Sequence, residues 1–476
     1  MGRFSEQFFR RKSTEVLLAE MVSHSGGLRR VLKPLDLTLL GIGAIIGAGI
    51  FVLTGVGASY AGPGLVLSFV LAGFACAMAA LCYAEFAAMI PIAGSAYSYS
   101  YATMGELVAW IIGWDLVLEY AVASAAVAAG WSHYLTVILS GLGVHLPDAI
   151  THSPGTAPGA IVNLPALLIV LLISAILYIG VQESARVNSI IVGVKLLAVL
   201  MVVAVGSFFV RPVNWTPFLP FGWNGVLSGA SYIFFAYIGF DAVSTAAEEA
   251  IDPQRSLPIG ILTSLAVCTF LYIAVALVLT GMVPTRQIDI EAPLAAAFRA
   301  RGLNFAAGVI SLGAVAGLTS VLLVLLLGQS RIFYAISRDG LLPPIFSRVH
   351  PKFRTPSVPT VLTGLAVGLT AGLVPIKIIA ELTNIGTLFA FALVCLGVWI
   401  LRNVEPELAR PFRTPWVPIV PVLGASSCTL MMFGLDRVTW ARFILWMSVG
   451  LLIYLGYGRF HSKLASGDNA GKRATA

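Results

Sequence analysis

Two apolar stretches that contain glycine decide how this chain folds: GIGAIIGAGIF at residues 41–51 and FFAYIGFD at residues 234–241. Each lies within an apolar run long enough to span a bilayer, which needs about 20 residues. Glycine weakens a helix because its backbone loses the most conformational entropy on folding. Inside a membrane, non-helical backbone is tolerated only where protein or a water-filled cavity satisfies its polar groups. The two stretches therefore predict two broken spanning helices around a protected site.

The composition indicates a polytopic α-helical membrane protein. Of the 476 residues, 58% are hydrophobic and only 11% are charged, and the mean hydropathy is +0.92. Soluble proteins carry about 25% charged residues, so most of this chain does not face water. We expect about twelve spans of roughly 20 residues each. They fall near 37–59, 63–90, 106–139, 161–181, 187–210, 225–250, 257–283, 304–336, 358–374, 378–401, 416–435 and 440–458.

The basic residues predict the orientation of the chain in the membrane. An even number of spans places both termini on one side, and Lys and Arg concentrate in cytoplasmic loops. Most of the 29 Lys and Arg residues fall in the two tails and in alternate loops on that same side. We therefore expect a multi-pass plasma-membrane protein with cytoplasmic termini. The net charge of +7 reflects this orientation and does not indicate nucleic-acid binding.

The positions of the two interruptions also predict an internal repeat. Helices 1–5 and 6–10 form two halves that each open with an interrupted helix. An odd number of spans in each repeat forces the two repeats to be inverted relative to each other. Twelve independent helices with incidental glycines are the alternative. The expected segments are an N-terminal tail at 1–35, five-helix repeats at 36–210 and 211–402, helices 11 and 12 at 403–460, and a C-terminal tail at 461–476.

The ends of a broken helix suit a small molecule that carries both charges. Glycines in the first stretch permit an unwound turn and close approach of a ligand. The second half-helix would offer free N–H groups and a positive dipole end to a carboxylate, while the first would offer carbonyl groups to a cation. A zwitterion such as an amino acid would use both ends. Close helix packing is the structural alternative for these glycines.

Ionisable residues within spans are costly and are candidate functional groups. By the helical rise, Lys195 lies about 14 Å into helix 5 and Glu119 about 20 Å into helix 3, while the first interruption lies roughly 16 Å past Asp36. These features share a depth near the midplane, and Asp241 directly follows the second interruption. A lysine here without a fixed counter-charge would gain and lose a proton during transport. A permanent ion pair between Lys195 and Asp241 or Glu119 is the alternative.

Other polar residues have simpler interpretations. Asp115 shares a helix face with Glu119 at i, i+4 and is expected to be a structural or vestibule residue. Glu85, near the end of helix 2, is expected at the cytoplasmic interface in contact with Arg255 or Arg338. The six histidines and five cysteines show no metal-ligand spacing, and no enzyme constellation appears. The sequence therefore predicts no metal site, no cofactor and no enzymatic activity.

Five motifs carry a resemblance to a known family. They are GIGAIIGAGIF (41–51), PIAGSAYSY (91–99), FFAYIGFDAVSTAAEE (234–249), DPQRSLPIG (252–260) and QSRIFYAISRDGLLP (329–343). With these motifs the chain resembles the amino acid–polyamine–organocation superfamily and, within it, bacterial members of the cationic amino acid transporter family. The resemblance covers helices 1 through about 12. It implies a leucine-transporter-like five-plus-five inverted repeat in which helices 1 and 6 are discontinuous.

The resemblance also implies which residues bind substrate and which couple transport to protons. The substrate carboxylate would bind backbone N–H groups near Gly47, Ala48 and Gly49, although many relatives have threonine where this chain has Ala48. The implied contacts of the α-amine and of the substrate side chain are then Ile45, Phe235, Ala236, Ile238, Glu119 and Leu325. Lys195 matches a helix 5 lysine that takes the place of a sodium ion in proton-coupled relatives. Glu119 and Asp241 match acids near the substrate and in the coupling network.

These features predict a secondary active transporter that imports L-amino acids by alternating access with a proton as the coupling ion. The expected partners are the amino acid and the lipid bilayer, while a small accessory membrane subunit stays open. An apolar floor at Leu325 would favour small neutral amino acids, and Glu119 could receive a cationic head group. The rivals are sodium-coupled transport through Thr319 and Ser320 of helix 8, exchange or uniport, and an amino-acid-sensing receptor.

Overall fold

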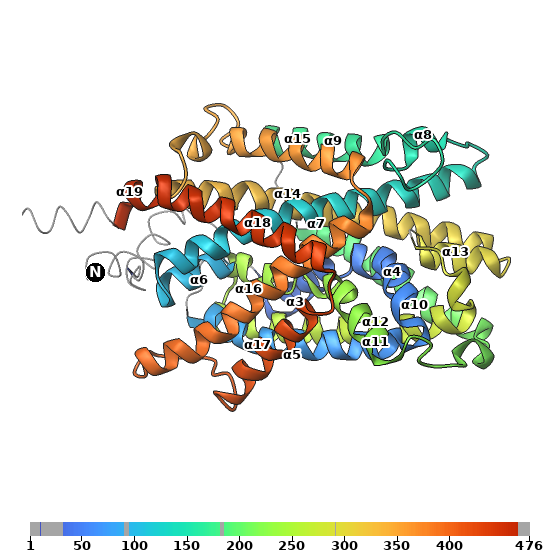
Figure 1. The fold of residues 1–476 in the computed structure, drawn as a ribbon, viewed down its shortest axis with the longest axis horizontal. Helices are drawn as coiled ribbons and strands as arrows, with labels where there is room; N and C mark the ends of the chain where they lie inside the picture. The colour runs from blue at the N-terminus through green and yellow to red at the C-terminus, as the bar shows by residue number, and fades with distance from the viewer. Residues whose placement is uncertain (1–9, 11–31, 90–94, 181–184, 291, 465–476) are drawn as a thin grey trace, which may run out of the picture.

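The computed structural model describes residues 10, 32–89, 95–180, 185–290 and 292–464 of the chain. In these residues the regular structure is helical, apart from an isolated parallel β-bridge between Leu32 and Ala250. Figure 1 shows long helices that run roughly along the longest axis of the molecule and pack side by side. Short helical turns and loops connect them.

The helices have the following bounds in chain order. They are α3 (Pro34–Ile45), α4 (Thr54–Ala61), α5 (Leu65–Met89), α6 (Ser95–Thr103), α7 (Glu106–Gly141), α8 (Asp148–Thr151), α9 (Leu164–Ile179), α10 (Ala185–Gly206), α11 (Gly222–Ile233), α12 (Pro253–Met282), α13 (Pro293–Ala300), α14 (Asn304–Arg338), α15 (Ser357–Leu373), α16 (Ile376–Val404), α17 (Ile419–Met432), α18 (Arg437–Ile453) and α19 (Arg459–His461). Three short helical turns matter for the site: η1 (Gly49–Leu53), η5 (Phe234–Tyr237) and η6 (Asp241–Glu249).

Local sequence signals set where several helices begin. Helix α3 starts at Pro34, whose missing N–H group is one that the first helical turn leaves unbonded anyway. The backbone N–H of Lys33 donates to the Asp36 carboxylate at 2.9 Å, which satisfies a donor at the helix start. At the start of α9, the side-chain oxygen of Asn163 accepts from the Ala166 N–H at 3.2 Å.

The described residues contain seven helical segments long and apolar enough to cross a membrane. They are Gly49–Met89, Glu106–Gly141, Ile190–Phe209, Pro253–Met282, Asn304–Arg338, Ile376–Val404 and Arg437–His461. Four shorter apolar helices accompany them, namely α3, α9, α15 and α17. The prediction of an all-α polytopic membrane protein is therefore confirmed.

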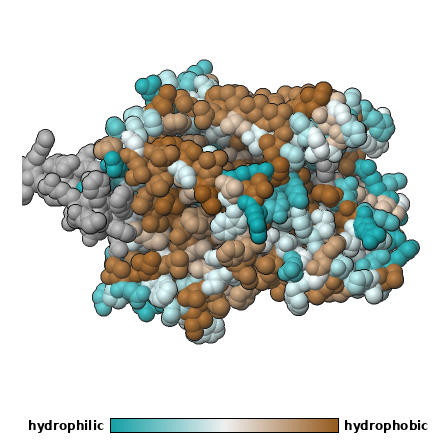
Figure 2. Space-filling model, in the orientation of Figure 1, coloured by the Kyte–Doolittle hydropathy of each residue, from teal (hydrophilic) through white to brown (hydrophobic). Residues whose placement is uncertain are grey.

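The outer surface suits a lipid environment. Large apolar side chains of α9 and α15, such as Leu172 and Leu369, are more than half exposed. Figure 2 shows hydrophobic residues across these helices, at the top of the view, and hydrophilic residues at the two ends of the molecule and in a group near the middle of the visible face. In water such a broad apolar surface would drive aggregation. In a bilayer it contacts lipid tails.

Both described ends of the chain lie at one end of the helical bundle. The N–H of Glu106, where α7 begins, donates to the Arg10 carbonyl at 2.9 Å. The Ser462 hydroxyl donates to the Glu106 carboxylate at 2.5 Å, and Figure 1 places α19 at the same left-hand end of the bundle as α6. We call this the termini end of the bundle.

Helix α7 occupies the centre of the bundle. It packs against α14 and α16, and most of its length is buried. Helix α18 packs along its outer side, where the rings of Trp114 and Trp446 stack at 4.5 Å. Each of these two indole N–H groups donates to the other residue's backbone carbonyl. Side chains on α7 that point inward therefore reach the interior where the broken helices lie.

Candidate functional site

The two sequence interruptions are breaks in helical geometry, and they pack directly against each other. Helix α3 ends at Ile45 and η1 begins at Gly49, while η5 ends at Tyr237. A Cβ atom on Gly49 would lie 2.1 Å from Ala236 Cα, far inside a normal carbon–carbon contact. On the other break, Gly239 has φ +118°, which L side chains rarely adopt. These two glycines let the two backbones meet.

The carbonyl groups at the end of α3 are bound by side chains from other helices. The last carbonyls of a helix have no partner within it. Here the Tyr272 hydroxyl of α12 donates to the Ile45 carbonyl at 2.8 Å. The Lys195 ammonium group of α10 donates to the Gly43 carbonyl at 2.7 Å. Because a carbonyl oxygen has two lone pairs, Ile45 could still accept a bond from a ligand amine.

Lys195 is buried between three helices. Its aliphatic stem crosses Gly317 of α14, where an added Cβ would lie 3.0 Å from Lys195 Cε. Its Nζ reaches the Gly43 carbonyl of α3. An ammonium group is a charge-assisted donor, so this bond is stronger than one between neutral groups. Lys195 therefore ties the first half of the broken helix to α10 and α14.

Asp241 stabilises the second break from within. Its side chain is buried, and its carboxylate accepts from the Gly239 N–H at 3.2 Å. The Ser244 hydroxyl donates to the Asp241 carbonyl at 2.6 Å. Of the neighbouring predicted residues, Phe235 and Ala236 are buried and Ile238 is half-buried. The acid thus holds the irregular turn that presents these residues.

Glu119 lies on the inward face of α7 and is buried. Within the described chain its Oε2 atom has no hydrogen-bond partner. It interacts electrostatically with Asp115 of the same helix and with Asp241 of η6. The structure therefore brings Glu119 and Asp241, the acids of the third and sixth expected spans, into one region.

Two side chains beside the first break were not identified from the sequence. Tyr272 bonds to Ile45, as described above. Val321 of α14 contacts Gly47, where an added Cβ would lie 3.0 Å from Val321 Cγ2. Leu325, the predicted pocket residue, lies one turn further along α14 and is half-buried. An apolar residue in an apolar helix and a tyrosine in a span carry no sequence signal that separates them from ordinary core residues.

The Thr319 hydroxyl, one of the two oxygen atoms expected for a sodium site, is hydrogen-bonded within the protein. The Thr319 hydroxyl accepts from Trp131 Nε1 at 2.9 Å and donates to the Val315 carbonyl at 2.7 Å. Ser320 is buried. Among the residues that the structure describes, no group of three or more His, Cys, Asp or Glu side chains could hold a metal ion.

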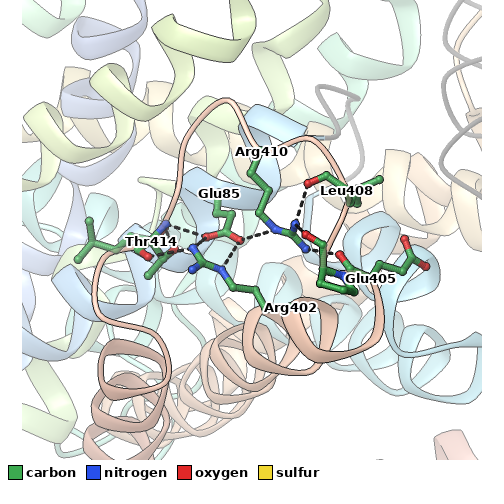
Figure 3. A network of polar contacts seen from close by, with 8 residues as sticks. Glu85, Arg402, Glu405, Leu408, Arg410 and Thr414 are labelled. Atoms are coloured by element: carbon green, nitrogen blue, oxygen red, sulfur yellow. Dashed lines mark hydrogen bonds and ion pairs between the residues drawn. The ribbon is translucent and has the colours of Figure 1, made fainter.

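Glu85 forms a separate network at the end of α5, shown in Figure 3. Arg402 donates to both carboxylate oxygens, at 3.1 and 2.7 Å, and Arg410 Nε lies 3.3 Å from Oε1. The N–H of Thr414 donates to Oε2 at 2.7 Å. The prediction that Glu85 contacts Arg255 or Arg338 is therefore wrong, because the segment after α16 folds back over the end of α5.

Comparison with known proteins shows that this chain is similar to permeases and transporters. Residues 32–454 match the family model described as amino acid permease. The chain is 51% identical to the methylthioribose transporter of Bacillus subtilis, over 96% of this chain and 99% of the relative. It is also 51% identical to a branched-chain amino acid permease of the same organism, over 96% and 98%. Cationic amino acid transporter 4 of Homo sapiens is 40% identical over 92% and 88%.

Proposed function

Because the chain belongs to the amino acid permease family of the amino acid–polyamine–organocation superfamily, we propose that it imports L-amino acids across the plasma membrane as a proton-coupled secondary transporter. Its relatives are transporters and permeases, so the chain is a membrane transporter and not an enzyme. The observation that carries the proposal is the contact between two broken helices, with a buried lysine bound to the end of one of them.

The substrate site in this proposal is mostly backbone. The carboxylate binds N–H groups near Gly47, Ala48 and Gly49, at the start of the second half of the first broken helix, where the helix dipole favours an anion. The α-amine binds carbonyl groups of Ile45 and of the second break, at Phe235, Ala236 and Ile238. Binding through backbone atoms explains why Ala48, which has no hydroxyl, is compatible with the site.

Proton coupling is proposed to act through Lys195, with Glu119 and Asp241 as the acids of the same region. The Lys195 bond to Gly43 is charge-assisted. Deprotonation would weaken that bond and loosen the first half of the broken helix from α10 and α14. Protonation of one side chain would thereby bias the position of a helix that lines the substrate site.

We propose neutral amino acids with small or branched apolar side chains as the substrate class. Val321 and Leu325 of α14 lie beside or near the first break and are apolar. A buried apolar surface favours an apolar side chain. Cationic amino acids are the second candidate, and the unpartnered Oε2 atom of Glu119 favours them.

The same proposal includes the finer architecture. It places about twelve spans in inverted repeats at 36–210 and 211–402, with helices 11 and 12 at 403–460. It places the termini end, with the tails at 1–35 and 461–476, in the cytoplasm. The alternating positions of the bundle would then expose the two breaks to one side of the membrane at a time.

Uptake of radiolabelled amino acids into proteoliposomes tests the proposal. We expect an inward proton gradient to drive accumulation by the wild type, and Lys195→Met to abolish that drive. Lys352→Met, at an exposed lysine, is the matched control and should transport like the wild type. Wild-type uptake that ignores the gradient would refute proton coupling, and gradient-driven accumulation that survives in Lys195→Met would refute coupling through Lys195. Accumulation driven by sodium at constant pH would support the sodium rival, and binding without flux would support the receptor rival.

A further inference from the structure

A second acid on α7 lies one turn from Glu119 and is not used in the function proposed above. Asp115 is completely buried. Neither of its carboxyl oxygens has a hydrogen-bond partner in the part of the chain that the structure describes. Buried polar groups in proteins are nearly always hydrogen-bonded. Asp115 is therefore an exception that needs an explanation.

The surroundings of Asp115 contain packing contacts but no partner that requires an acid. Its carboxyl group lies against Gly386 of α16, where an added Cβ would be 2.7 Å from Asp115 Oδ1. The glycine leaves room for the carboxyl group without offering it a donor side chain. An apolar side chain of similar size would fill the same space at a lower desolvation cost.

Among the described residues, the titratable groups that interact with Glu119 include acids and tyrosines. Glu119 interacts electrostatically with Asp115 on its own helix and with Asp241 of η6, and α16 adds the Thr387 hydroxyl. Tyrosines of α5, α6 and α7 also interact electrostatically with Glu119 or Asp241, namely Tyr83, Tyr99 and Tyr120. An ionised carboxylate without a donor or a cation is costly in a buried site. The Asp115 carboxyl group is accordingly neutral and holds a proton in this conformation.

The position of Asp115 along α7 indicates toward which end of the bundle its proton would be released. Helix α7 begins at Glu106, at the termini end of the bundle, and Asp115 comes before Glu119 along the helix. At i, i+4 the two Cβ atoms are separated by about 5–6 Å, so the carboxyl groups can meet directly or through one water molecule. Asp115 thus stands between the substrate region and the termini end.

We propose that Asp115 is a proton-carrying residue that exchanges a proton with Glu119 and releases it toward the termini end. In the first step the O–H bond of protonated Asp115 breaks and its proton passes to water when that side of the bundle opens. The O–H bond of protonated Glu119 then breaks and an O–H bond forms on the ionised Asp115 carboxylate, which restores its neutral form. No other co-reactant is needed. The inference rests on the proton coupling proposed above and adds to it the exit route.

The replacement Asp115→Asn, in the full-length protein in proteoliposomes, tests this role because asparagine has nearly the same shape and cannot carry the proton. We expect gradient-driven uptake to fall on the order of 100-fold, as for loss of a positioned acid–base group. Exchange of labelled for unlabelled amino acid at equal pH should stay at the wild-type rate, because exchange needs no net proton release.

Three outcomes would overturn the proposal. Unchanged gradient-driven uptake would show that no obligatory proton passes through Asp115. Loss of exchange together with uptake would indicate a structural or substrate-binding role. If Asp115→Asn does not fold, infrared spectra of wild-type protein labelled with carbon-13 aspartate decide the question. A protonated aspartate carbonyl band that changes when the amino acid is added is expected, and a spectrum without that band would overturn the proposal.

The failure of this inference is distinguishable from failure of the function on which it rests. If proton coupling itself is wrong, the wild type will already show no gradient-driven accumulation. If only the role of Asp115 is wrong, the wild type will accumulate substrate, and Asp115→Asn will either behave like it or lose exchange together with uptake. Lys352→Met again controls for the effect of substitution and reconstitution.

Discussion

Replacing Gly49 by alanine tests whether the contact between the two broken helices is as close as the structure shows. The added Cβ would lie 2.1 Å from Ala236 Cα and 2.5 Å from Ala236 Cβ. Carbon atoms normally approach to about 3.5–4.0 Å, so the two backbones would have to separate by roughly 1.5 Å. The atoms in the way belong to backbone and to a side chain without rotamers. The clash cannot be relieved by a side-chain rotation.

The sign of the change in unfolding free energy distinguishes the steric clash, which destabilises the protein, from the helix propensity of alanine, which stabilises it. Overpacking a close contact costs about 1–3 kcal/mol, while glycine to alanine in a helix gains about 1 kcal/mol. We expect a net loss of up to about 2 kcal/mol in the free energy of unfolding. Substrate affinity should fall by about tenfold for each 1.4 kcal/mol of binding energy lost, because the clash lies within the proposed site.

Thermal unfolding and substrate binding of the purified protein measure this prediction. The matched control is Gly308→Ala in α14, where nothing lies within 4 Å of the added Cβ. That variant should be neutral or more stable by up to about 1 kcal/mol. A Gly49→Ala protein as stable as the control, with unchanged binding, would refute the inferred contact between the breaks.

Two further substitutions test contacts away from the glycines. Tyr272→Phe removes the hydroxyl that donates to the Ile45 carbonyl. We expect a loss of about 0.5–1.5 kcal/mol in the free energy of unfolding and weaker substrate binding. Thermal unfolding and substrate binding measure both, and unchanged values would contradict a role for this bond. Glu85→Gln leaves the buried Arg410 guanidinium without its carboxylate partner, so unfolding free energy should fall by about 3–5 kcal/mol. Limited proteolysis should then cut the 405–418 segment faster, and wild-type resistance would argue against the network as its anchor.

Much of the fold could be predicted because its signals are local along the chain. Hydropathy identifies spanning segments without reference to any neighbour. Glycines within those segments marked the stretches where α3 and α11 end. Counting residues from a span's end also estimates depth, which is how Lys195 and the first break came to be placed at a similar level. Their contact through Gly43 agrees with that estimate.

Lateral contacts could not be predicted in the same way. Glu85 was correctly placed near a span end, yet its partners Arg402 and Arg410 are more than three hundred residues away in sequence. Depth alone does not distinguish them from Arg255 or Arg338. The stacking of Trp114 on Trp446 depends likewise on which helix packs beside α7.

The sequence by itself determined that this chain spans a membrane many times and that two of its helices break. Tertiary structure decided that Gly49 meets Ala236 and that Tyr272 binds Ile45. It also left the Asp115 carboxyl group without a hydrogen-bond partner among the residues that the structure describes. The physical reason is that burial and glycine content act on each segment separately. Which groups meet depends on how helices distant in sequence pack side by side, and only the folded bundle specifies that.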